Sequence, residues 1–584
     1  MAKKNKTSQN KAISPAWQEP VKIIEQKKNT YLSWLLSAVA ITVICFLAML
    51  QNGFTNWDDD NYVLNNALLQ GPDWKGIFTT PVSSNYHPLT IISFAFNYAI
   101  SATNPFSYLL VNLLLHAINT ALVFIFIYRL SNEKKIVAFF TALVFGIHPM
   151  HVESVAWVSE RKDVLYAFFF LLSLLQYWKY LQTEKQTKLW LCFLFFVLSL
   201  LSKPAAIILP LTLFLLDYWQ GRTISKKLII EKIPFFLAAL AFAIITVKVQ
   251  SATAITSTAV YSLWMRFFFA CYGIMIYSIR FFIPYPLSAF HPFPMQDNVG
   301  WEIYISPLFV LALLFLVWRF RKNKVVVFGF LFFLFNLLLV LQFVSVGLAI
   351  VAERYTYMPY AGIAFLIAMI AEKFISTTTK TYLMVLAVVT FFAFAFITFQ
   401  QTKVWKDSNT LWTNVIEHDA TAALPRAKRA EYNYNKAISP NPGDTTALLR
   451  NVITDCTTAI ENDTGSTRQL NEKQQRNLYY MRGIAYNYLG EYENAFKDFS
   501  TYLIFNPNDN KILFYRGAIL VNYYKKYEAA IDAFNKAIAV SPQGLYYLNR
   551  SICYYNLGYT ANAKADAAIA LQKGTAVPVD YFKL

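Results

Sequence analysis

Long, uninterrupted apolar runs constrain this chain more than any other feature. The clearest are "AFFFLLSLLQYW" (167–178), "LWLCFLFFVLSLLS" (189–202) and "VVVFGFLFFLFNLLLVLQFVSV" (325–346). Such runs are typical of membrane-crossing helices, because a helix satisfies its own backbone hydrogen bonds where no water is present. Hydrophobic residues make up 56% of the chain and charged residues 15%, which excludes an ordinary soluble globular class. We therefore expect an all-α, polytopic membrane bundle over residues 31–400.

The net charge of +18 is gathered in short basic loops between the apolar runs, such as "RLSNEKK" (129–135) and "GRTISKK" (221–227). This distribution follows the positive-inside rule, so the charge indicates orientation and not nucleic-acid binding. It predicts that residues 1–30 form a cytoplasmic basic tail of a protein in the inner or plasma membrane. We expect eleven to thirteen spans, with the exact number left open between residues 233 and 283.

Residues 401–584 are polar and contain an internal repeat. Gly483, Gly517 and Ser551 are spaced by 34 residues, and corresponding prolines follow at Pro507 and Pro542. Small residues where two helices touch, and a proline after the second helix, resemble the tetratricopeptide repeat (TPR). The repeats are clear over about 475–574. They predict an α-solenoid, an architecture that usually contacts other proteins.

Charged and histidine side chains gather in two loops, 51–88 and 148–163, that the positive-inside pattern places on the outer side. The first loop contains Asp58, Asp59, Asp60 and His87, and the second contains His148, His151, Glu153 and Arg161. Lys203 and Arg354 interrupt apolar sequence at outer helix ends, where a cation is costly and normally has a partner.

Several kinds of chemistry can be compared on this pattern. The three aspartates alone fit a helix start as well as a catalytic site. The segment "HPMHVE" lacks the HExxH arrangement of zinc enzymes, and a transporter would place its charges near mid-bilayer. Carboxylates beside Lys203 and Arg354 at a membrane surface suit transfer from a lipid-phosphate donor. A carboxylate would deprotonate the acceptor, and the cations would hold the phosphate.

Three segments, "NWDDDNYVLNN" (56–66), "HPMHVESVAWVSERKDVLY" (148–166) and "VAERYTYMPYAG" (351–362), carry a resemblance to a known family, together with "YHPLT", "SKP" and the repeats. The chain resembles the transmembrane and tetratricopeptide repeat-containing O-mannosyltransferases and their bacterial relatives. The resemblance implies a GT-C glycosyltransferase fold. It also implies inverting transfer of a sugar, mannose in the eukaryotic members, from a polyprenyl- or dolichyl-phosphate donor to protein Ser/Thr hydroxyls outside the cytoplasm.

The resemblance also assigns residues. The paired-aspartate position falls on Asp58 and Asp59, and the phosphate-side arginine falls on Arg354. Two positions depart from the family pattern: His87 stands where relatives often have arginine, and Pro204 stands where they often have an acid.

We therefore expect Asp58 to act as the base and Asp59 to position it, with Lys203 and Arg354 holding the donor phosphate. The expected sugar and acceptor site comprises His87, His148, His151, Glu153 and Arg161. Besides the lipid-phosphate sugar we expect no required cofactor and no metal site, although divalent-metal dependence stays open because acidic clusters bind metal in other GT-C branches.

The expected partners are the lipid donor, membrane lipids and an acceptor protein presented by extracytoplasmic repeats. Two alternatives remain open. One is a GT-C enzyme that glycosylates a cell-envelope glycan or lipid, and the other is a non-catalytic membrane scaffold that recruits proteins through its repeats.

Overall fold

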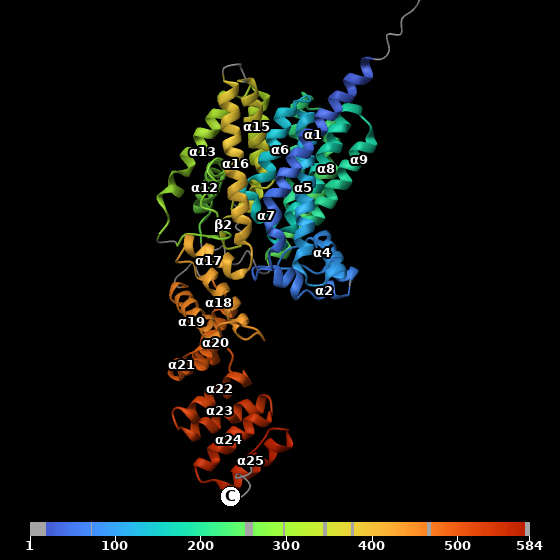
Figure 1. The fold of residues 1–584 in the computed structure, drawn as a ribbon. Helices are drawn as coiled ribbons and strands as arrows, with labels where there is room; N and C mark the ends of the chain where they lie inside the picture. The colour runs from blue at the N-terminus through green and yellow to red at the C-terminus, as the bar shows by residue number, and fades with distance from the viewer. Residues whose placement is uncertain are drawn as a thin grey trace, which may run out of the picture.

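The computed structural model describes residues 19–71, 73–251, 261–295, 298–342, 347–374, 379–463 and 469–578, with side chains from Tyr31 onward. An upright helical bundle is followed by a stack of helical hairpins that extends away from one end of the bundle (Figure 1). Within these ranges the only strands are β1 (His291–Pro292) and β2 (Ala349–Val351), which pair antiparallel. The predicted all-α class is confirmed. Residues 1–18 of the predicted basic tail and residues 579–584 of the repeat region lie outside the described residues.

The bundle is built from fourteen helices of the described chain, connected at the end nearest the repeat region by short helical turns. The helices are α1 (Glu19–Phe46), α4 (Pro88–Ser101), α5 (Pro105–Leu130), α6 (Lys135–Ile147), α7 (Val152–Ala156), α8 (Arg161–Thr183), α9 (Gln186–Ser202), α10 (Leu209–Gln220), α11 (Lys226–Ser251), α12 (Leu263–Arg280), α13 (Trp301–Arg319), α14 (Lys324–Leu337), α15 (Pro359–Lys373) and α16 (Lys380–Val404). The short turns that carry site residues are η2 (Asp60–Leu64), η4 (Val158–Glu160), η5 (Pro204–Ile208) and η8 (Glu353–Thr356).

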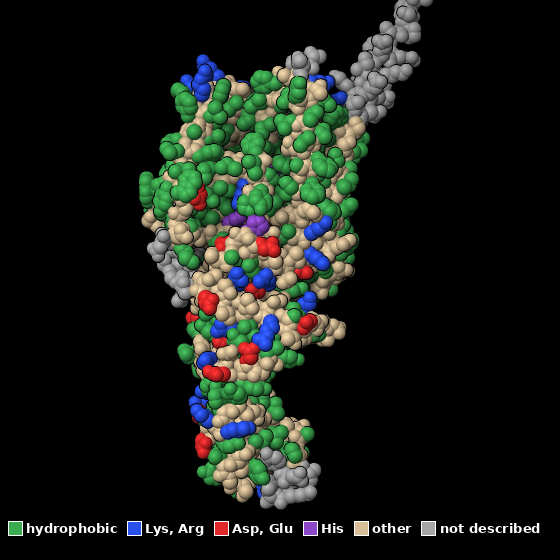
Figure 2. Space-filling model, turned by 60° about the vertical axis from the view of Figure 1, so that its left-hand side comes forward, with side chains coloured by type: hydrophobic (Ala, Val, Ile, Leu, Met, Phe, Trp, Pro, Cys, Tyr) green, Lys and Arg blue, Asp and Glu red, His purple; other side chains and the backbone are tan. Residues whose placement is uncertain are grey.

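Six helices in the described ranges are long and apolar enough to cross a membrane, and seven if the bent pair α6–α7 counts as one broken span. Four shorter apolar helices lie beside them: Pro88–Ser101, Gln186–Ser202, Pro204–Gln220 and Lys324–Val340. Hydrophobic side chains cover the broad upper part of the surface, and acidic, basic and histidine side chains gather below it (Figure 2). The chain is an integral membrane protein, and eleven to thirteen spans stays a prediction.

The α6–α7 pair bends by 54° at His148, directly before Pro149. Proline removes a backbone donor and disfavours helical geometry at the preceding residue, so α6 must end here. His148 accordingly has an extended backbone (φ −69°, ψ 128°). The break places α7 and the start of α8 at the end of the bundle from which the repeats extend (Figure 1).

The repeat region consists of α17 (Ser408–His418), α18 (Ala423–Ala437), α19 (Thr445–Asn462), α20 (Glu472–Tyr488), α21 (Tyr492–Phe505), α22 (Asn510–Asn522), α23 (Tyr527–Val540), α24 (Gly544–Asn556) and α25 (Thr560–Gln572). A Cβ atom at Gly483 would lie 2.8 Å from the Phe499 ring, and one at Gly517 would lie 2.6 Å from the Phe534 ring. The 34-residue spacing therefore marks close helix contacts, and the predicted TPR solenoid is confirmed.

Candidate functional site

The loop that carries the three aspartates is bound to the first helices of the repeat region. The Asn56 side chain donates to the backbone oxygen of Lys428 on α18 (2.8 Å) and accepts from Trp412 Nε1 on α17 (2.7 Å). Trp57 stacks on Trp412 with ring centroids 4.7 Å apart. The hairpin α17–α18 is therefore part of the frame of this loop.

Asp59 is a fully bonded carboxylate. One oxygen accepts from the backbone N–H (2.8 Å) and the hydroxyl (3.1 Å) of Thr55, and the other accepts from the backbone N–H (3.0 Å) and the hydroxyl of Ser159. Burial raises the pKa of Asp59 to about 6, although these four donors oppose the shift. The side chain ties the aspartate loop to the turn before α8, which suits the expected positioning role.

Asp58 differs from its neighbour. Its side chain is half-buried, and its carboxylate makes no hydrogen bond or close ion pair with any part of the chain that the structure describes. Burial raises the pKa of Asp58, and the positive charge of Lys162 opposes that rise. Asp60 is also half-buried, with its pKa raised by burial, but the charges that act on it most strongly are Lys428 and Glu431 of α18. Of the three acids, Asp58 is the one that faces the charged cluster with its oxygens unbonded.

Glu160 lies at the centre of this cluster. One of its oxygens lies 3.0 Å from Lys162 Nζ and 3.4 Å from Arg354 Nε, and the other lies 3.5 Å from Lys203 Nζ. The structure thus brings Lys203 and Arg354, which are far apart in sequence, to the same carboxylate.

Each of these two cations has a second buried acid. Lys203 pairs with Asp163, and Arg354 pairs with Glu153 through its guanidinium and its backbone N–H (2.8 Å). The side chains of Lys203 and Arg354 are 18% and 16% exposed, whereas those of the acids are at most 2% exposed. The two cations are therefore partly accessible, whereas the acids that hold them are buried.

Aromatic rings and unbonded polar atoms surround the cluster. Lys162 Nζ lies 4.9 Å from the centre of the Tyr62 ring, and the Arg354 guanidinium lies 5.8 Å from that of Trp157. His87 stacks on Tyr62 at 5.2 Å. Nε2 of His87 and Nε1 of Trp157 are buried without a hydrogen-bond partner, and the Glu160 oxygen that is paired with Lys203 at 3.5 Å makes no hydrogen bond. Unbonded buried polar atoms are rare and call for an explanation, which a polar ligand in this site would provide.

His87 is the N-cap residue of α4, but its side chain does not cap the helix. Burial, and then the nearby charge of Lys162, lower the pKa of His87 to about 3. The ring is therefore neutral at pH 7, and it offers one donor and one acceptor where the family pattern often has a charged arginine.

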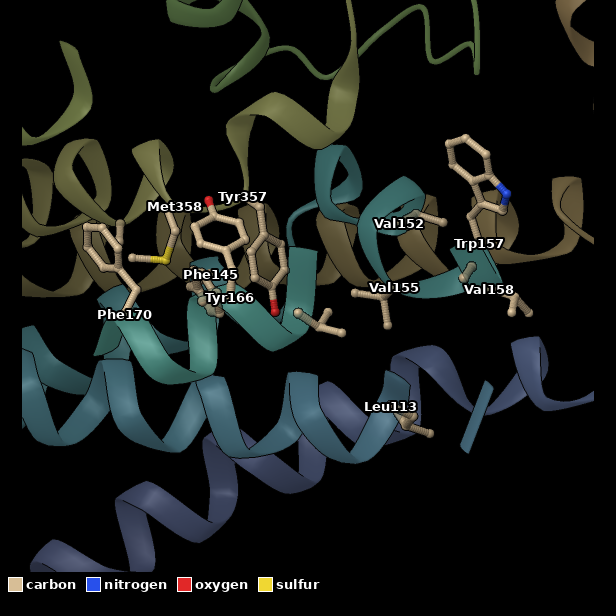
Figure 3. Close-up of a cluster of buried hydrophobic side chains, with 14 of the residues drawn as sticks. Leu113, Phe145, Val152, Val155, Trp157, Val158, Tyr166, Phe170, Tyr357 and Met358 are labelled. Carbon is tan, nitrogen blue, oxygen red and sulfur yellow. The ribbon is translucent and has the colours of Figure 1, made fainter. Parts of the chain in front are cut away.

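Three predicted residues are not brought into the cluster. Both ring nitrogens of His148 and of His151 bond to backbone groups around the α6–α7 break. Arg161 donates to Asn112, Ser93, Asn97 and the Tyr108 backbone oxygen, and so it joins α4 to α5. Figure 3 shows the packed interior behind this region, where Phe145 lies against Tyr357 (4.9 Å). The sugar-site role of these three residues stays a prediction, and their contacts here are those of packing groups.

Sequence reasoning missed Lys162 and did not place Glu160 in the site. The signal was the run of four charges at 160–163, where α8 begins. Residues three apart lie on one helix face, so Glu160 and Asp163 point together while Arg161, one position on, points elsewhere. Among the residues with described positions, no three His, Cys, Asp or Glu side chains are grouped as a metal ion would require. Metal independence stays a prediction.

No protein-family model matches the chain. "Protein O-mannosyl-transferase F38B6.6" of Caenorhabditis elegans is 24% identical over 443 residues, which cover 70% of this chain and 60% of that protein. The mouse protein "Protein O-mannosyl-transferase TMTC3" is 33% identical over 156 residues, which cover 24% of this chain and 16% of that protein. The mouse protein "Protein O-mannosyl-transferase TMTC2" is 36% identical over 159 residues, which cover 26% of this chain and 19% of that protein. The chain thus matches only part of the length of each relative.

Among solved structures, the crystal structure of MamA protein matches 29% of this chain and 87% of its own, with a TM-score of 0.23 and 17% identity. The sequence matches agree with the predicted resemblance: the chain is similar in sequence to the TMTC protein O-mannosyl-transferases.

Proposed function

We propose that the chain is a GT-C-type membrane glycosyltransferase that transfers mannose, or a similar sugar, from a polyprenyl- or dolichyl-phosphate donor to protein Ser/Thr hydroxyls. The names of its relatives support protein O-mannosylation in general. The observation that carries the proposal is the unbonded, half-buried carboxylate of Asp58 beside a cluster in which Lys203 and Arg354 share Glu160.

In this reaction Asp58 accepts the proton of the acceptor hydroxyl as its oxygen attacks the anomeric carbon. The bond between that carbon and the donor phosphate oxygen breaks, and the phosphate leaves with the electron pair. Attack from the face opposite the phosphate inverts the anomeric configuration. Burial favours this role, because a carboxylate with a raised pKa is a stronger base.

Lys203 and Arg354 would stabilise the charge that develops on the departing phosphate. They are already held in place by Asp163, Glu153 and Glu160, so they need little rearrangement when the donor binds. The three acids keep the two cations close together before the donor binds. Their negative charges also reduce the net positive charge of the cluster.

The site lies at the end of the bundle from which the repeats extend, and the basic loops between α5 and α6 and between α8 and α9 lie at the other end (Figure 1). Because short basic loops are cytoplasmic as a rule, this arrangement supports an extracytoplasmic site and repeat region. The repeats would then present the acceptor protein on the side where the lipid-linked sugar is used.

The proposal is tested by incubating the purified protein with a panel of polyprenyl-phosphate sugars and envelope proteins, and analysing the products by mass spectrometry. We expect a hexose on Ser or Thr with one donor of the panel. A sugar found only on a glycan or lipid would favour the alternative acceptor. No transfer with any donor, from protein that still binds one, would contradict catalysis and favour a scaffold.

A further inference from the structure

A cleft of about 550 Å³ opens between α9 and α11. Trp190 and Phe193 of α9 line one wall, and Ile230 and Pro234 of α11 line the other. Phe235 closes the deep end, with its ring 5.3 Å from that of Phe193. The volume is in the range of specific binding pockets, and the walls are mainly apolar.

The position of the cleft separates it from the candidate site. α8 begins within the charged cluster and runs for 23 residues to the loop before α9, a length of about 35 Å. Gln186 and Lys227, which also line the cleft, are in the first turns of α9 and α11. The mouth therefore lies near the membrane surface at the end of the bundle opposite the repeats, and a ligand here does not depend on the proposed reaction.

The wall formed by α11 is shaped by a proline inside the helix. Pro234 has no backbone N–H, so the carbonyl of Ile230 lacks its helical partner. Both residues line the cleft, and the break in the hydrogen-bond ladder lies within its wall.

The mouth carries positive charge. Lys227 lines it, and its Nζ lies 3.0 Å from Glu184, with both side chains more than half exposed. Lys185, Lys188 and Lys226 lie in the same helix starts or next to them. Glu231 is the acid on the inner wall, and it is already paired with Arg222 at 3.0 Å. The surplus charge is therefore at the membrane surface and the apolar surface is deeper, which matches the two ends of an anionic lipid.

We propose that this cleft binds an anionic phospholipid of the surrounding membrane, with one acyl chain between α9 and α11 and the headgroup phosphate at Lys227. Inside a bilayer the apolar walls contact lipid chains and not water, and a lysine at the surface favours an anionic headgroup over a zwitterionic one. The complementary charge at the mouth selects the class of lipid, and the cleft retains the chain.

The test titrates the purified full-length protein with dioleoyl phosphatidylglycerol or dioleoyl phosphatidylcholine and counts retained lipids by native mass spectrometry. We expect phosphatidylglycerol to be retained more tightly. Lys227→Ala should weaken its retention about fivefold, the factor expected for one lysine at an anionic headgroup. Lys226→Ala is the matched control, because this neighbouring lysine carries the same charge but does not line the cleft.

A second variant, Ile230→Trp, fills the cleft and should lower the retention of phosphatidylglycerol without affecting that of phosphatidylcholine. Equal retention of the two lipids by the wild type, or equal effects of Lys226→Ala and Lys227→Ala, would overturn the proposal and leave only non-specific lipid around the bundle. Lys227 is exposed and its replacement leaves the core intact, so its result is decisive even where Ile230→Trp does not fold.

Discussion

At the scale of single residues, three adjacent aspartates have three different surroundings. Asp59 is fully bonded, Asp60 faces α18, and Asp58 is left beside the charged cluster. The sequence predicted that the acids and two distant cations belong together, because each is costly near a membrane without a partner. It did not predict that Glu160 and Lys162 connect these groups. The side chains of the charged run that point inward depend on the residue at which α8 starts.

Lys203→Ala and Arg354→Ala should each weaken donor binding more than they weaken folding. Each side chain is partly exposed, and the loss of a charge-assisted contact to phosphate costs about 1.5–3 kcal/mol. Binding of a polyprenyl-phosphate sugar to each purified variant measures this. Lys134→Ala is a control, since Lys134 is likewise paired with an acid, Glu372, but is not part of the charged cluster. Unchanged donor affinity in either variant would make that residue structural.

At the scale of elements, the repeats were readable in sequence because small residues recur where helices touch. Arginines at 482, 516 and 550 and aspartates at 498, 532 and 566 share the same 34-residue spacing. Arg482 and Arg550 each pair with their aspartate through two hydrogen bonds. Asp532 instead points outward to Lys536 (2.8 Å). A spacing identifies equivalent positions, but it does not determine side-chain direction.

This difference gives a matched pair of variants. Arg482→Ala leaves the buried Asp498 carboxylate without its two donors and should cost about 1.5–3 kcal/mol of stability. Arg516→Ala removes one contact to Ser500 and should cost clearly less. Thermal unfolding of the two variants compares them. Equal losses would show that the Arg482–Asp498 pair adds nothing to the solenoid.

The attachment of the aspartate loop to α17 and α18 was not predicted, because its partners are more than 350 residues apart in sequence. Asn56→Ala removes both side-chain bonds that hold the loop to this hairpin. A small displacement of a reacting group can cost about a hundredfold in rate, so turnover should fall by up to about that factor while donor affinity is kept. Asn510→Ala, which removes a bond to Tyr546 in the outer repeats, is the control. Equal turnover in the two variants would contradict a positioning role.

At the scale of the whole molecule, the apolar runs predicted a membrane bundle, and the 34-residue repeat predicted the solenoid that follows it. The exact number of spans could not be predicted, because several apolar helices are shorter than a bilayer and one is broken at Pro149. The site forms where this break, the aspartate loop and the first repeat hairpin meet. The site depends on contacts between residues far apart in the sequence, and local sequence patterns do not predict such contacts.

The proposed orientation of the molecule in the membrane leads to a separate prediction. A reporter that is active only in the cytoplasm, fused after residue 584, should give no signal, because the basic loops would hold the opposite end of the bundle inside. A reporter active only outside the cytoplasm is the matched fusion and should give signal. Cytoplasmic activity of the first fusion would overturn the extracytoplasmic placement of the repeats and weaken the protein-acceptor proposal.

The central claim is that Asp58 is the catalytic base, and turnover by purified Asp58→Asn tests it most directly. Asparagine keeps the shape of the side chain but cannot accept the acceptor proton, and loss of a general base costs about 10²–10⁴ in rate. Donor affinity should be unchanged, because in the proposed reaction Lys203 and Arg354, and not Asp58, hold the phosphate. Asp60→Asn, also half-buried but facing Lys428, should keep near-normal turnover, with and without chelator. A rate for Asp58→Asn near that of the wild type would contradict the assignment.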